Sequence, residues 1–151
     1  MKSYLAGPLF TTAERAFNAR LKELLAKKGH EVWLPQESEQ ELMTPNEIFR
    51  KDVQGIDWAD AVVANMDGPD PDSGTCWECG YAYKKKPIIV FRTDFRVAYE
   101  VRHDFQIGLD RDQAPYNLML TESADLRLDL PFRSDEEVAN EIDRALRRVR
   151  G

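Results

Sequence analysis

Short apolar runs alternate with longer amphipathic stretches along the chain. The runs span residues 4–6, 31–35, 61–66 and 87–91, and the third and fourth are almost purely apolar. Runs of this length and composition predict strands that are buried on both faces of a parallel sheet. Because strands and helices alternate and crossovers are right-handed, the pattern predicts an α/β fold, a doubly wound sandwich. The segment "YNLML", residues 116–120, is a candidate fifth strand.

The amphipathic stretches carry helix start signals. In a capping box, a Thr or Ser side chain and a Glu three residues later satisfy the first backbone groups of a helix. Three such boxes occur: Thr11 with Glu14, Thr44 with Glu47 (followed by Pro45 at the first helical position), and Ser134 with Glu137. We expect the first helix to end near Lys28. A helix without a box is expected near Thr75–Lys85, with Asp72 or Ser73 as its cap.

One segment breaks the alternation. From Arg92 to about Pro115 the sequence is charged and aromatic, and a connection of this length is more often a functional lid or an interface than an idle loop. No repeat and no linker interrupts the chain, so we expect residues 1–151 to form a single domain.

Net charge and hydropathy narrow the range of partners. The chain carries a formal net charge of −6 and has a pI near 5.0, which argues against nucleic acid or an anionic membrane as a partner. No apolar run approaches the ~18 residues of a membrane span. The N-terminal residues break at Gly7-Pro8 and do not form a signal peptide. We therefore expect a cytoplasmic protein.

Cys76 and Cys79 form a lone C-x-x-C motif. A metal site normally needs four ligands, and His30 and His103 lie far away along the chain, so we expect neither a metal nor a cofactor. A thiol redox pair is an alternative, because such pairs lie at helix starts after strands. The other interpretation is two small, half-buried residues.

Three carboxylates have both structural and functional explanations. Asp52 lies beside an apolar stripe formed by Phe49, Val53 and Ile56, so it is either partly desolvated or at the edge of the stripe in water. Glu78 falls in the first turns of the third helix, where an acid interacts favourably with the helix dipole.

Asp72 needs no function beyond a turn or a cap, and Asp67 and Asp70 have turn explanations as well. In doubly wound sheets, however, ligands bind beyond the carboxyl ends of the strands. If Asp52, Asp72 and Glu78 converge there, they form an acid-lined pocket, and carboxylate pairs serve glycosyl transfer. We expect the helix N-terminus to keep a nucleophilic Glu78 ionised.

Several motifs, in order and at matching spacing, resemble the nucleoside 2-deoxyribosyltransferase family. They are "YLAGPLF" from Tyr4, "DVQGIDWADAVVANMDG" from Asp52 and "DPDSGTCWECGYA" from Asp70, and "NLML" from Asn117 extends the resemblance. The resemblance implies a flavodoxin-like fold with a parallel sheet of about five strands. It also implies cleavage of the N-glycosidic bond of a 2'-deoxynucleoside, with transfer of the 2-deoxyribosyl group to another free nucleobase.

The resemblance further implies roles for individual residues. Glu78 matches the nucleophile of a D-x-G-x-x-x-E-x-G pattern and would form a covalent glycosyl-enzyme, so that configuration is retained. Asp52 would bind the base and protonate it as it leaves. Tyr4 would orient the nucleophile, and Asp72 would contact the bound nucleoside.

The loop after the first strand, with Gly7 and Phe10, would also contact the substrate. Asn117 would reach into a neighbouring subunit's site and hold the 5'-hydroxyl, which implies a homo-oligomer built from dimers (a dimer, tetramer or hexamer). Related monophosphate hydrolases carry small and basic residues where this chain has Phe10 and threonines, which favours a 5'-hydroxyl over a 5'-phosphate.

The sequence departs from the family at its end. In better-known members the terminal carboxylate reaches the site, whereas this chain ends in the basic "RALRRVRG". Two other functions stay open. One is a 2'-deoxynucleoside (5'-monophosphate) N-glycosidase, which sends water onto the same intermediate; the other is a non-catalytic nucleotide-binding domain.

Overall fold

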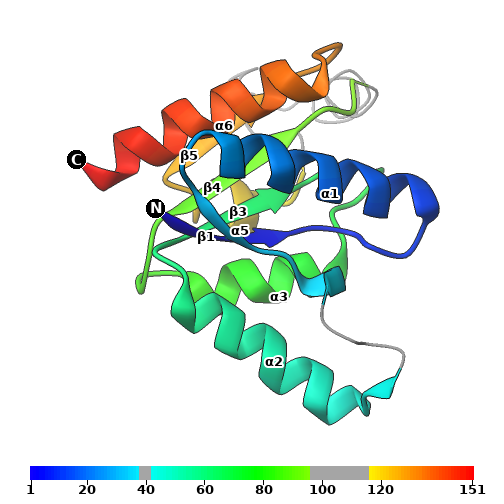
Figure 1. The fold of residues 1–151 in the computed structure, drawn as a ribbon. Helices are drawn as coiled ribbons and strands as arrows, with labels where there is room; N and C mark the ends of the chain where they lie inside the picture. Colours follow the sequence, from blue (N-terminus) through cyan, green and yellow to red (C-terminus); the bar gives the residue numbers. More distant parts are fainter. Residues whose placement is uncertain (38–41, 96–115) are drawn as a thin grey trace, which may run out of the picture.

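A parallel sheet of five strands lies at the centre of the computed structural model, which describes residues 1–37, 42–95 and 116–151. The strands are β1 (Lys2–Ala6), β2 (Glu31–Trp33), β3 (Ala61–Asn65), β4 (Ile88–Arg92) and β5 (Leu126–Asp129). Their order is β2-β1-β3-β4-β5, which is the flavodoxin-like order with its switch point between β1 and β3. The predicted doubly wound α/β fold is confirmed (Figure 1).

Helices cover both faces of this sheet (Figure 1). They are α1 (Thr12–Lys27), α2 (Pro45–Trp58), α3 (Ser73–Ala82), α5 (Leu118–Thr121) and α6 (Asp135–Arg150), and a short 3₁₀ turn spans Pro35–Glu37. The three predicted capping boxes open α1, α2 and α6, each with both reciprocal hydrogen bonds. Asp72, and not Ser73, is the cap of α3.

The strand residues alternate between two apolar cores. Leu5, Val63 and Phe91 face the core that α1 and α6 cover. Tyr4, Val62 and other even-numbered neighbours face the core of α2, α3 and α5. Since successive side chains of a strand point to opposite faces, this alternation places Tyr4 beneath α2 and α3.

The prediction of a fifth strand at residues 116–120 is wrong. Leu118–Thr121 forms the helix α5, and the fifth strand is Leu126–Asp129, where every second residue is exposed. The edge position of β5 explains the miss, because a strand buried on fewer sides lacks the continuous apolar run used to find the others. The predicted lid or interface segment falls largely within residues 96–115, outside the described residues.

No helix among the described residues is both long and apolar enough to cross a membrane. The C-terminal residues of α6 lie at the amino end of the sheet, where Val149 and Arg150 line a surface cavity together with Met1 and Lys2. This is the end opposite to the loops that follow β1 and β3 (Figure 1).

Candidate functional site

Tyr4 and Glu78 meet between the sheet and α3. The Tyr4 hydroxyl donates a hydrogen bond of 2.5 Å to Oε1 of Glu78, although the two residues are 74 positions apart in the chain. Tyr4 is fully buried, and both its burial and the nearby carboxylate raise the pKa of its hydroxyl, so the hydroxyl stays a donor at neutral pH. The contact therefore fixes one oxygen of Glu78.

Burial controls the protonation of Glu78. Burial is the main reason that the pKa of Glu78 rises from its usual 4.5 to about 7; the hydrogen bond from Tyr4 opposes the rise, and the charges of Asp52 and Asp72 add to it. The expectation that the helix N-terminus keeps Glu78 ionised is wrong, because burial of the carboxylate has a larger effect on its pKa than the helix dipole. Glu78 lies more than one turn into α3, where the dipole effect has faded and desolvation dominates.

Asp52 comes to the same site from α2. It precedes the buried Ile56 by four residues, which places both side chains on one face of the helix. Its Oδ1 is buried and accepts no hydrogen bond from any described residue. Burial raises the pKa of Asp52 to about 6, against the lowering effect of Lys51. Asp52 is thus the partly desolvated acid that one of the two sequence interpretations required.

Asp72 has the structural role that the sequence allowed. Its Oδ2 accepts hydrogen bonds from the backbone N–H of Thr75 at 2.9 Å and from the Thr75 hydroxyl at 3.0 Å, and it caps α3. Its charge also acts on Glu78. Tyr4, Asp52, Asp72 and Glu78 therefore form one cluster, to which β1, α2 and the start of α3 contribute.

Among the described residues, the other predicted site residues have no side-chain hydrogen bond to this cluster. Gly7 follows β1, and a Cβ there would lie 3.1 Å from Cβ of Asn65, so the loop passes close to the end of β3. Phe10 is 70% exposed. The Asn117 side chain accepts a hydrogen bond of 2.9 Å from the backbone N–H of Met119 and caps its own helix α5.

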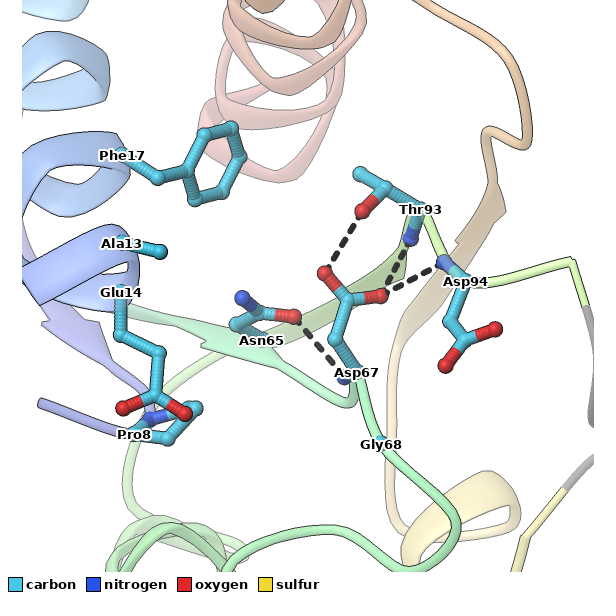
Figure 2. Close-up of a pocket in the computed structure, with 9 residues that line it drawn as sticks. All are labelled: Pro8, Ala13, Glu14, Phe17, Asn65, Asp67, Gly68, Thr93 and Asp94. Atoms are coloured by element: carbon cyan, nitrogen blue, oxygen red, sulfur yellow. Dashed lines mark hydrogen bonds between the residues drawn. The ribbon is translucent and has the colours of Figure 1, made fainter. Parts of the chain in front are cut away.

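A cavity of about 370 Å³ lies at the carboxyl end of the sheet, on the face covered by α1 and not on the face covered by α2 and α3. Figure 2 shows its walls, which include Glu14 from α1, Asn65 at the end of β3, Asp67 in the loop that follows, and Asp94 after β4. Asp67 holds the loop after β4 by accepting hydrogen bonds from the backbone N–H groups of Thr93 and Asp94, at 2.6 and 2.8 Å. This is a contact between distant residues and not the local turn role expected from the sequence. The described lining contains carboxylates but no lysine or arginine.

An aromatic contact between α2 and α3 was not found from the sequence. Phe49 was assigned to the apolar stripe of α2, yet it is 51% exposed and meets the Trp77 ring edge-on, with centroids 5.2 Å apart. Trp77 in turn stacks on Tyr81 at 5.3 Å. The i, i+4 spacing of Trp77 and Tyr81 was a signal for their own stacking on one face of α3, but not for the contact with Phe49.

Both cysteines are free thiols. Burial raises the pKa of Cys76 and raises that of Cys79 to about 12, and nearby carboxylates act in the same direction. Because the thiolate is the reactive form, these shifts disfavour the thiol redox alternative. Within the described ranges, no three His, Cys, Asp or Glu side chains are grouped to hold a metal ion.

Comparison with known proteins adds to this geometry. A family model described as nucleoside 2-deoxyribosyltransferase matches residues 3–119. The structure is similar to a 2-deoxyribosyltransferase from the psychrotolerant bacterium Bacillus psychrosaccharolyticus, at 27% identity and a TM-score of 0.65, over 93% of this chain and 91% of that chain. No curated protein matches the sequence.

Two further solved structures resemble the fold. One is a 2-deoxyribosyltransferase from Leishmania mexicana, at 25% identity and a TM-score of 0.69, over 95% of this chain and 97% of that chain. The other is a CMP N-glycosidase from Clostridium botulinum, at 21% identity and a TM-score of 0.60, over 95% and 98% of the two chains. At this identity, the similarity to the glycosidase shows only that the two chains share a fold.

Proposed function

The chain belongs to the nucleoside 2-deoxyribosyltransferase family, and we propose that it transfers the 2-deoxyribosyl group of a 2'-deoxynucleoside to a second nucleobase. The observation that carries this proposal is the half-buried pair of acids, Asp52 and Glu78, with the Tyr4 hydroxyl on one oxygen of Glu78. Two carboxyl groups with raised pKa values can share one proton near neutral pH. Such a pair supplies a nucleophile and an acid together once the shared proton lies on Asp52. Because the pKa of Glu78, about 7, exceeds that of Asp52, about 6, the proton lies mainly on Glu78 in the free protein and must pass to Asp52 when the substrate binds.

In the first step, one carboxylate oxygen of Glu78 attacks C1' of the deoxyribosyl group. The N-glycosidic bond breaks, its electron pair goes to the nitrogen of the base, and Asp52 delivers its proton to the leaving base. Tyr4 binds Oε1 of Glu78, which leaves Oε2 to attack. The products are a glycosyl ester on Glu78 and a free base.

In the second step, a nitrogen of the incoming base attacks C1' from the face that the first base left. The ester bond to Glu78 breaks, and the incoming base gives its proton to Asp52. Two inversions give net retention. The unpaired, buried Oδ1 of Asp52 supports this role, because an N–H or a protonated nitrogen of a nucleobase can satisfy it.

The substrate we propose carries a 5'-hydroxyl and not a 5'-phosphate. The loop after β1 borders the cavity beside α1, and the described lining of this cavity includes Glu14, Asp67 and Asp94 without a basic residue. A phosphate dianion near these carboxylates would be repelled. We further propose that Asn117 acts across a subunit contact, since in its own chain it caps α5 and is exposed next to Leu118 and Met119, which are 62% and 72% exposed.

A transfer assay tests the proposal. Incubation with deoxyinosine and adenine should yield deoxyadenosine and hypoxanthine, separated by liquid chromatography. Glu78→Gln should abolish the product, while Glu31→Gln, an exposed glutamate on β2, should leave the rate unchanged.

The second candidate is the N-glycosidase, which the fold shared with the CMP N-glycosidase keeps open. In that case water and not a base would take the deoxyribosyl group from Glu78. Free deoxyribose without deoxyadenosine would then be the product, and added adenine would not change the rate at which hypoxanthine appears.

A further inference from the structure

We propose that a seam between α2 and α3 sets the separation of Asp52 and Glu78 and so positions the two acids for reaction. The α2–α3 seam consists of Phe49 and Asp57 on α2, and of Trp77 and Tyr81 on α3. The inference rests on the proposed function for its consequence in catalysis, but it makes a claim about geometry that can be tested without any turnover.

The seam has an aromatic end and a hydrogen-bonded end. At one end Phe49 meets the ring of Trp77, with centroids 5.2 Å apart and planes at 61°. Trp77 stacks on Tyr81, with planes at 14°. At the other end the Tyr81 hydroxyl donates to the Asp57 carboxylate, at 3.0 Å to Oδ1. An edge-to-face aromatic pair of this geometry is favourable beyond the area it buries.

The seam brackets the two acids. On α2, Asp52 lies between Phe49 and Asp57 in the sequence; on α3, Glu78 lies between Trp77 and Tyr81. Phe49 contacts Trp77, and further along both helices Asp57 contacts Tyr81. Two contacts at different points along the helices fix how far one helix is shifted along the other, as well as the distance between them. The two acids belong to different helices, so their separation depends on this relation.

The half of α2 that carries Asp52 has few other anchors. The buried residues of α2 are Gly55 and Ile56, both C-terminal to Asp52. The C-terminal end is also held by Lys86, whose ammonium group donates to the carbonyls of Ile56 and Ala59. At the N-terminal half, Phe49 provides the described ring contact to α3. Without it, that half can tilt away from α3 about its anchored end.

A tilt would separate the carboxyl groups of Asp52 and Glu78. Displacement of a reacting group by about 1 Å can cost roughly a hundredfold in rate. It would also weaken the repulsion between the two carboxylates and admit water, and both changes lower the pKa of Glu78. The seam residues are proposed to act through the placement of the two helices and not by touching the reacting groups, so they are positioning residues.

The test compares Phe49→Ala, Trp77→Ala and the double variant with Tyr83→Ala. Tyr83 follows α3 and is 47% exposed, as is Trp77, but it is not part of the seam. We expect kcat for deoxyribosyl transfer to fall roughly ten- to a hundredfold in each seam variant, with KM changed by less than about threefold. The double variant should lose little more than Trp77→Ala, because Trp77→Ala already removes the contact with Phe49 together with the stacking on Tyr81.

A titration gives the readout that does not require activity. Carboxyl-carbon NMR should show a lower Glu78 pKa in Phe49→Ala and Trp77→Ala, and the wild-type value in Tyr83→Ala. Trp77→Phe keeps a ring against Phe49 and should restore most of kcat and the wild-type pKa. This variant also keeps the test valid if an alanine variant does not fold.

The outcomes separate the two proposals. If the wild-type protein has no transfer activity, the proposed function is wrong. The titration then still tests whether the seam positions the two acids: a Glu78 pKa that falls only in the seam variants supports this inference. If Phe49→Ala and Trp77→Ala keep the wild-type Glu78 pKa, or if Trp77→Phe behaves like Trp77→Ala in both readouts, the positioning inference is wrong.

Discussion

Replacing Glu78 by glutamine should stabilise the folded protein above neutral pH. The folded state raises the pKa of this carboxyl group from its usual 4.5 to about 7, chiefly because burial disfavours the charged form. A folded pKa above the unfolded one means that the folded state binds the proton more tightly. The favourable contribution is therefore complete below pH 4.5 and is lost as the pH rises through about 7.

The shift sets the size of the effect. A difference of about 2.5 pKa units corresponds to about 3 kcal/mol, at 1.36 kcal/mol for each unit. This is an upper value, because the side chain keeps some contact with solvent. Glutamine is nearly isosteric with a protonated glutamate and can still accept the Tyr4 hydrogen bond, but it carries no charge at high pH.

Urea unfolding at a series of pH values measures the difference. We expect Glu78→Gln and wild type to have equal stability near pH 4, and the variant to gain up to about 3 kcal/mol by pH 8, or roughly 6–12 °C in Tm. Glu31→Gln, on the exposed side of β2, is the control and should follow wild type throughout. A variant that is equally or less stable than wild type at pH 8 would refute the assignment of Glu78 as a desolvated acid.

Two further sets of substitutions test the site and its scaffold. Tyr4→Phe removes a donor to a charged carboxylate, worth about 1.5–3 kcal/mol, so it should raise the pKa of Glu78 by roughly 1–2 units. The substrate 7-methyl-2'-deoxyguanosine has a base that leaves without protonation. For this substrate, the pH below which kcat/KM falls should rise by the same amount. A loss of rate that is equal at every pH would contradict this prediction. Gly55→Ala should destabilise the fold by about 1–3 kcal/mol, because a Cβ at residue 55 would lie 2.5 Å from the Trp33 ring. Gly80→Ala should stabilise the fold by up to about 1 kcal/mol, because a Cβ at residue 80 would have no neighbouring atom within 4 Å. Thermal unfolding measures both, and equal shifts would contradict the difference in packing.

The elements with strong local signals could be predicted from the sequence. Capping boxes depend on residues three positions apart, so Thr11, Thr44 and Ser134 marked their helices correctly. The strands β3 and β4 could be predicted as apolar runs because every residue in them is buried. The short helix α5 was mistaken for a strand because four residues cannot show a helical period.

The site could be predicted only in part, because its properties depend on contacts between distant residues. Asp52 and Glu78 were found as candidates, but their protonation depends on burial that no local pattern shows. The helix dipole suggested an ionised Glu78, whereas the folded environment raises its pKa. The contact of Phe49 with Trp77 joins two helices and could not be inferred from either helix alone.

The family, the fold and the cluster of Tyr4, Asp52 and Glu78 support our proposal that Glu78 is the nucleophile of a double displacement. The two acids differ in what they require. Glu78 must lose its proton to attack, and Asp52 must keep one to release the base, so the pair works with a single shared proton. Asp52 on α2 and Glu78 on α3 are both partly buried, which raises the pKa of each carboxyl group.

Mass spectrometry after reaction with a 2-deoxy-2-fluoro nucleoside tests this claim most directly. Fluorine at C2' destabilises the cationic transition states and slows release of the sugar, so a covalent intermediate should accumulate. We expect one fluorosugar adduct on the peptide that contains Glu78, and none in Glu78→Gln. An adduct on another residue, or continued release of base with no adduct on the protein, would contradict it.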